Sequence, residues 1–213
     1  MVIRKRGVLI LTLFLGVILT ACSKIMYGLY GLTNPAVVDE KVIASYQTRY
    51  SIPFEDGYQI DTAYNSFLFS LNTLRYKAQI KNHYQPLQAL YYDRVGQMQS
   101  FQINCYAGGF PNLLWDRDHI LTTFPPLQQA PIDSILPLNT VLKYLRPLTQ
   151  TSTFIMTEYD YVVVIFWNRF MSKQSERFIH FIQDNSKLAK NKKVKILYVN
   201  DDNLFAISEI NKK

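Results

Sequence analysis

The segment YVVVIFW at residues 161–167 decides the fold class of this chain. It is an uninterrupted apolar run, rich in β-branched and aromatic side chains, and it is too short to cross a membrane. Such a run is typical of a strand buried on both faces of a sheet. Residues 172–190 follow with a helical spacing of apolar side chains, and residues 194–199 form a second apolar run. Strand, helix and strand in this order predict a right-handed parallel βαβ unit.

Residues 85–106 have the pattern of a β-hairpin. Apolar side chains alternate on both sides of a turn at Asp93–Gly96, and the second extended run places Phe101, Ile103 and Cys105 on one side. Upstream, residues 36–49 and 62–80 have helical spacing, with Asp61 as a cap for the second helix.

The remaining segments are less regular. Residues 108–137 predict a long loop, because prolines are spread through them, and residues 138–146 predict a short helix that ends at Pro147. The pattern as a whole predicts one α/β domain over residues 36–213, with a mixed sheet, amino-terminal helices, a hairpin and a carboxy-terminal βαβ unit.

The βαβ unit resembles part of the thioredoxin fold over about residues 158–205. In that family an apolar strand ends in Phe-Trp, and after three residues a Cys-x-x-Cys motif opens a helix. Here Phe166-Trp167 precede Asn168-Arg169-Phe170, and Met171 and Gln174 occupy the positions of the two cysteines. A thioether and an amide cannot form the thiolate that attacks a disulfide, so thiol–disulfide exchange at this site is excluded.

The thioredoxin fold also has a hairpin after this unit, and no such hairpin follows residue 205 here. We therefore hypothesise that the earlier hairpin at residues 85–106 pairs beside residues 161–167 and takes that place. A hairpin in a separate sheet would contradict this hypothesis.

The first residues have the pattern of an export signal. Three basic residues at positions 4–6 precede an apolar run at residues 7–21, which is shorter than the roughly 20 residues of a membrane-spanning helix. Leu19-Thr20-Ala21-Cys22 resembles the lipobox of bacterial lipoproteins. The resemblance implies a diacylglyceryl group on the Cys22 sulfur, removal of residues 1–21 and acylation of the new amino group. An ordinary signal peptide with a chance cysteine and an uncleaved helix are the alternatives.

Removal of 21 residues from 213 would leave 192, and loss of the three basic residues would reduce the net charge from +7 to +4. We expect residues 22–35 to serve as lipid anchor and tether, with the membrane as a partner and an envelope protein as a further possible partner. Nucleic acid is not expected, because the lysines at residues 187–195 are typical of a solvated helix end. The residue after Cys22 is Ser23, whereas an aspartate there would favour retention at the inner membrane. The chain resembles in this respect the lipoproteins sent to the outer membrane, so we expect a location at the outer membrane, facing the periplasm.

Cys105 is the one thiol left once Cys22 is lipidated, which rules out an internal disulfide. It is either a reactive nucleophile beside the loop Gly108-Gly109 or a small buried hydrophobe on a strand, and we favour the second interpretation. A nucleophile also needs a nearby base, which the sequence does not place.

The sequence predicts no cofactor and no metal site. His83, His119 and His180 lack metal-binding spacing, Asp116, Asp118 and His119 are more typical of a loop surface, and Asn200–Asn203 lack the glycine and glutamate of a calcium loop.

We expect a non-catalytic binding or structural module on a membrane. The alternatives are a thiol-dependent envelope enzyme, of the peroxidase or reductase kind, that uses Cys105, and a ligand carrier with a deep apolar cavity under the proline-rich segment.

Overall fold

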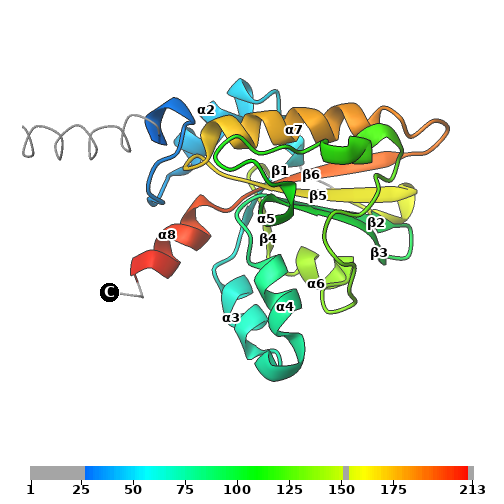
Figure 1. Cartoon of the computed structure of the whole chain (residues 1–213), viewed down its shortest axis with the longest axis horizontal. Helices are drawn as coiled ribbons and strands as arrows, with labels where there is room; N and C mark the ends of the chain where they lie inside the picture. The colour runs from blue at the N-terminus through cyan, green and yellow to red at the C-terminus, as the bar shows by residue number, and fades with distance from the viewer. Residues whose placement is uncertain (1–26, 151–153, 211–213) are drawn as a thin grey trace, which may run out of the picture.

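The computed structural model describes residues 27–150 and 154–210, which form helices around a six-stranded mixed sheet of order β3-β2-β5-β6-β1-β4 (Figure 1). The two central strands are parallel, and Tyr161 lies opposite Val194 while Trp167 lies opposite Asn200. The connection between them is a single helix, so the predicted βαβ unit and the predicted α/β class are confirmed. The strands are β1 (Gly57–Ile60), β2 (Gln88–Asp93), β3 (Met98–Ile103), β4 (Leu145–Pro147), β5 (Tyr161–Trp167) and β6 (Val194–Asn200).

The hairpin of β2 and β3 lies on the free side of β5, as hypothesised from the sequence. Strand β2 runs antiparallel to β5, with Gln88 opposite Phe166 and Asp93 opposite Tyr161. The turn forms because the Asp93 carboxylate accepts hydrogen bonds from the backbone N–H groups of Val95 and Gln97. The parallel strands β5, β6 and β1 and an antiparallel hairpin thus share one sheet.

Helices cover both faces of this sheet (Figure 1), so alternate side chains of β5 enter two different cores. Val163, Ile165 and Trp167 pack with residues of α2 and α7, whereas Val162, Val164 and Phe166 pack with residues of α3, α4 and α6. Burial on both faces explains the uninterrupted apolar sequence of the strand. The α-helices are α2 (Glu40–Arg49), α3 (Ala63–Ser70), α4 (Thr73–His83), α5 (Asn104–Ala107), α6 (Leu138–Leu142), α7 (Ser172–Ser186) and α8 (Asp202–Ile210).

The prediction of one continuous helix over residues 62–80 is wrong, because two helices, α3 and α4, occupy this segment. The chain leaves helical geometry at Leu71, and a new helix begins because the Asn72 side chain accepts hydrogen bonds from the N–H groups of Leu74 and Arg75. Leu74, whose spacing in one continuous helix would place it on the apolar face of that helix, is therefore 96% exposed. The Asp61 carboxylate does accept the hydrogen bond of Ala63 N–H at the start of α3.

Short elements at the sheet edge and at the carboxyl end also differ from the prediction. Strand β1 lies between residues 49 and 62, where the sequence predicted no element. The predicted helix over 138–146 ends at Leu142 because β4 follows and pairs with β1. The segment Asn200–Asn203 at the end of β6 contains the start of α8. Within residues 27–150 and 154–210, no helix is both long enough and apolar enough to span a membrane. The apolar run at 7–21 and Cys22 lie outside the described residues.

Candidate functional site

The loop after β5 is held by a buried hydrogen-bond network centred on Asn168. Its side-chain amide donates to the Pro86 carbonyl at 2.9 Å and to Asp201 Oδ1 at 3.0 Å, and its Oδ1 accepts from Met171 N–H at 2.9 Å. The Ser175 hydroxyl holds the backbone of the same residue, since it accepts a hydrogen bond from Asn168 N–H and donates one to the Asn168 carbonyl. These contacts fix the loop that leads into α7 and join it to the strand ends of β2 and β6.

Two carboxyl groups follow β6 in the same region. Asp201 is 1% exposed, its Oδ2 has no hydrogen-bond partner among the described residues, and burial together with the nearby Asp202 raises its pKa well above the usual value. Burial also raises the pKa of Asp202, although Asn200 and the Arg169 N–H donate hydrogen bonds that oppose the shift. Both groups lie at the carboxyl ends of parallel strands, where α/β proteins commonly place ligand sites.

The described part of the amino-terminal segment, which begins at Tyr27 within the expected anchor and tether at 22–35, lies against this loop. Thr33 N–H donates to the Phe170 carbonyl at 2.8 Å, and Ser172 N–H donates to the Gly31 carbonyl at 3.1 Å. Gly31 has a φ of +66°, and a Cβ atom there would lie 2.6 Å from Ser172 Oγ. Glycine is therefore required for the close approach. The described part of the expected tether, residues 27–35, is packed on the domain.

A cleft of about 690 Å³ lies between this segment and the loop. Met171, which stands where the resemblance to thioredoxin has its first cysteine, forms part of the wall, and Leu32 pairs with it in a β-bridge. Gln174, at the second position, is buried and accepts a hydrogen bond from Leu113 N–H. The lining is mainly aromatic and aliphatic: Tyr27, Leu32, Thr33, Asn34, Phe110, Phe170 and Met171. Such a wall can bind an apolar group, but it offers no thiolate or paired acid and base.

Cys105 is exposed and lies in the short helix α5, so the favoured interpretation of a buried residue on a strand is wrong. The reason is that β3 ends at Ile103 and the chain then enters the short helix α5, although Asn104 N–H still donates to the carbonyl of Leu87 opposite it. Partial burial raises the pKa of the thiol above its ordinary value, and the nearby Lys81 only partly opposes this shift. The thiol is accessible, but its environment disfavours the reactive thiolate.

We expect alkylation of Cys105 by iodoacetamide at pH 7 to be slower than that of a cysteine in an unstructured peptide. The raised pKa leaves less thiolate at this pH, and the rate should continue to rise above pH 9. The rate is measured by mass spectrometry of the native protein between pH 7 and 10. A rate above that of the peptide at pH 7 would show an activated thiol.

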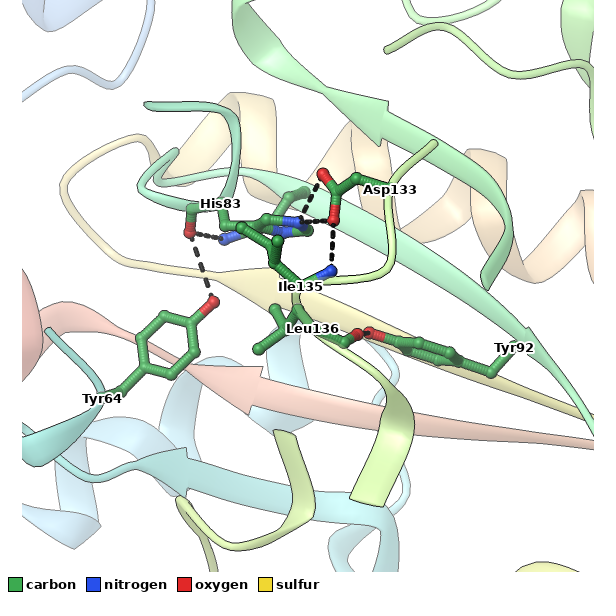
Figure 2. A network of polar contacts seen from close by, with 7 residues as sticks. Tyr64, His83, Tyr92, Asp133, Ile135 and Leu136 are labelled. Atoms are coloured by element: carbon green, nitrogen blue, oxygen red, sulfur yellow. Dashed lines mark hydrogen bonds and ion pairs between the residues drawn. The ribbon is translucent and has the colours of Figure 1, made fainter. Parts of the chain in front are cut away.

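A second polar network, which no sequence pattern indicated, surrounds His83 on the opposite face of the sheet (Figure 2). His83 Nε2 lies 3.1 Å from both carboxylate oxygens of Asp133, and the ring stacks on Phe101 with centroids 4.8 Å apart. The ring is fully buried, and its Nδ1 has no hydrogen-bond partner among the described residues. A catalytic histidine would need this nitrogen to reach a nucleophile.

The contacts around His83 instead fasten the proline-rich segment to the sheet. Asp133 also accepts from Ile135 N–H, and Tyr92 donates its hydroxyl hydrogen to the Leu136 carbonyl at 2.9 Å (Figure 2). Tyr64 donates to the His83 carbonyl. A histidine and an aspartate 50 residues apart give no local motif, so the sequence alone carries no signal for this pair.

The remaining candidate residues do not converge on one site. His119 is largely exposed, with Nδ1 3.8 Å from Asp116 Oδ2, and Asp118 pairs with Arg117. Across the described ranges there is no group of three His, Cys, Asp or Glu side chains that could hold a metal ion. The proline-rich segment borders two surface clefts, at Phe110 and at residues 132–137, the second with a volume of about 610 Å³.

No protein family, curated protein or solved structure matches this chain. The fold and the cleft define the class: an α/β domain with a mixed six-stranded sheet and an apolar cleft at the loop between β5 and α7.

Proposed function

We propose that the protein is a lipid-anchored bacterial envelope protein that works as a non-catalytic binding module, with the cleft beside Met171 as its binding site. The observation that carries this proposal is the position of the cleft. Residues 27–34 form one of its walls, and Tyr27 lies five positions after Cys22, the candidate lipidation site. Anchor and binding site are therefore adjacent in the chain.

The chemistry of the cleft supports binding rather than catalysis. Its polar members, Thr33 and Asn34, stand among aromatic and thioether side chains, and the buried carboxyl of Asp201 does not line it. Apolar walls with a few polar groups are typical of sites that bind an apolar ligand or an apolar side chain of a partner. We infer a location at the outer membrane, facing the periplasm, from the residue after Cys22.

Replacement of Cys22 by alanine is expected to move the protein from the membrane fraction to the soluble fraction, because the acyl chains would be absent. The measurement is fractionation of intact cells, followed by mass spectrometry of the amino-terminal peptide and separation of the two membranes by density. Cys105→Ser is the matched control and should stay with the membrane. An unmodified Cys22 in the native protein, or a Cys22→Ala variant that stays in the membrane after loss of residues 1–21, would overturn the proposal.

The alternative function, a thiol-dependent envelope enzyme, is favoured by one observation, the exposure of Cys105. The raised pKa of this thiol opposes it. The two functions are separated by Cys105→Ser assayed for peroxide and disulfide reduction beside the native protein. Activity that disappears in this variant, with an unchanged circular dichroism spectrum, would establish the enzyme.

A further inference from the structure

We propose that one end of the domain lies against the lipid bilayer, through a surface formed by the amino-terminal segment, the loop tip at Phe110 and the end of α8. We call this the anchor-end surface and define it by the exposed apolar side chains Tyr27, Val37, Phe110 and Ile210. The inference rests on the proposed lipid anchor and adds how the domain is oriented on the membrane.

The length of chain between the anchor and the domain limits how far this end can lie from the bilayer. Tyr27 follows Cys22 by five positions, so a fully extended chain reaches at most about 18 Å. From Tyr27 onward the segment turns back on itself, with Leu32 N–H donating to the Tyr27 carbonyl at 2.9 Å. It is held to the start of α7 because Lys173 Nζ donates to the Leu29 carbonyl at 2.7 Å and Ser172 N–H donates to the Gly31 carbonyl at 3.1 Å. A lipid on Cys22 therefore holds the start of α7 near the membrane, with no long linker between them.

Exposed apolar side chains gather at this same end. The four side chains of the anchor-end surface are 53–63% exposed. They border two hollows, the cleft of about 690 Å³ and a second of about 310 Å³ between residues 34–37 and α8, and Asn34 lines both. The surface is thus continuous across the two hollows. Exposed apolar clusters of this kind mark interaction sites, and aromatic rings with a polar group are favoured at lipid headgroups.

The opposite end of the sheet has a matched exposed residue for comparison. Val95, in the β2–β3 turn, is 71% exposed. The register of β2 on β5 places this turn beside Tyr161, at the far end of β5 from the loop that contacts the amino-terminal segment. Figure 1 shows the same arrangement, with the dark blue segment and α8 at one end and the β2–β3 turn at the other. A domain seated on its anchor-end surface keeps Val95 in water.

The test places a tryptophan at each end and measures its distance from lipid. Full-length Val37→Trp and Val95→Trp variants are purified from membranes and reconstituted in vesicles of phosphatidylethanolamine and phosphatidylglycerol that contain brominated phospholipid. We expect the bromine atoms to quench Val37→Trp about threefold more than Val95→Trp, because interfacial side chains enter the headgroup region. The native Trp115 and Trp167 are each 1% exposed and give the same background in both variants.

The outcomes distinguish the anchor-end surface from the lipid anchor on which it rests. Stronger quenching at position 37 supports the anchor-end surface. Equal quenching of the two variants, in protein whose acylated peptide is confirmed by mass spectrometry, overturns the surface and leaves the anchor in place. Protein that carries no acyl group and is absent from the membrane fraction overturns the proposed function and this inference together. Circular dichroism checks folding, and both substituted side chains are exposed in the native structure.

Discussion

Replacement of Asn168 by alanine is expected to lower the free energy of unfolding by about 3–5 kcal/mol. The native side chain is fully buried and bonds to three groups: the buried Asp201 carboxyl, the buried Met171 N–H and the partly buried Pro86 carbonyl. Alanine leaves all three without this partner, and the Asp201 and Met171 groups are buried. A buried polar group without a partner costs about 1–3 kcal/mol, so two of them together with the partly buried Pro86 carbonyl give a large effect.

Asn72→Ala is the matched control. Asn72 also accepts backbone hydrogen bonds, from Leu74 and Arg75, but it caps an exposed helix end where water can replace it. Its loss should cost about 1 kcal/mol. Urea unfolding followed by tryptophan fluorescence measures both variants. A loss for Asn168→Ala no greater than that for Asn72→Ala would contradict the central role of Asn168 in the loop.

The central part of the fold was predictable because its sequence patterns are long and local. The apolar run at residues 161–167, the helical spacing after it and the alternation at 87–91 each repeat over several residues. The placement of the hairpin beside β5 followed from the free edge that a βαβ unit leaves exposed. Strands β1 and β4 were missed because each has only three or four residues, and such short segments carry no clear periodicity.

The candidate site was less predictable, because long-range contacts form it. The sequence identified Met171 and Gln174 as replacements for two cysteines, but it gave no indication that residues 27–34 pack beside Met171. The bond between Asn168 and Asp201 joins residues 33 positions apart, and that between His83 and Asp133 joins residues 50 apart. Cys105 was misplaced because the apolar alternation of β3 continues two residues beyond the end of the strand.

Asp201→Asn is expected to stabilise the protein at pH 8 by roughly 1–3 kcal/mol and to have little effect near pH 4. The native carboxyl is fully buried, and only its Oδ1 has a partner, the Asn168 amide. An amide oxygen can keep this hydrogen bond, and an amide carries no charge that burial would penalise. The substitution therefore removes the cost of a buried charge.

The direction of this change in stability with pH follows from the raised pKa of Asp201. Below about pH 3.8, the ordinary value, the carboxyl is protonated in both the folded and the unfolded chain. As the pH rises from there to the higher native pKa, the unfolded chain releases its proton first, so stability falls with rising pH. Asp202, whose pKa is also raised, contributes in the same direction and remains in the variant.

Urea unfolding of the native protein and of Asp201→Asn between pH 4 and pH 8 measures this difference. We expect the two curves of stability against pH to meet near pH 4 and to separate as the pH rises, with the variant above. Parallel curves would show that the charge on Asp201 does not lower the stability of the folded protein. We do not expect this result, because Asp201 Oδ2 has no hydrogen-bond partner among the described residues. If the variant is more stable yet binds more weakly at the proposed site, the buried carboxyl lowers stability while it positions the loop beside that cleft.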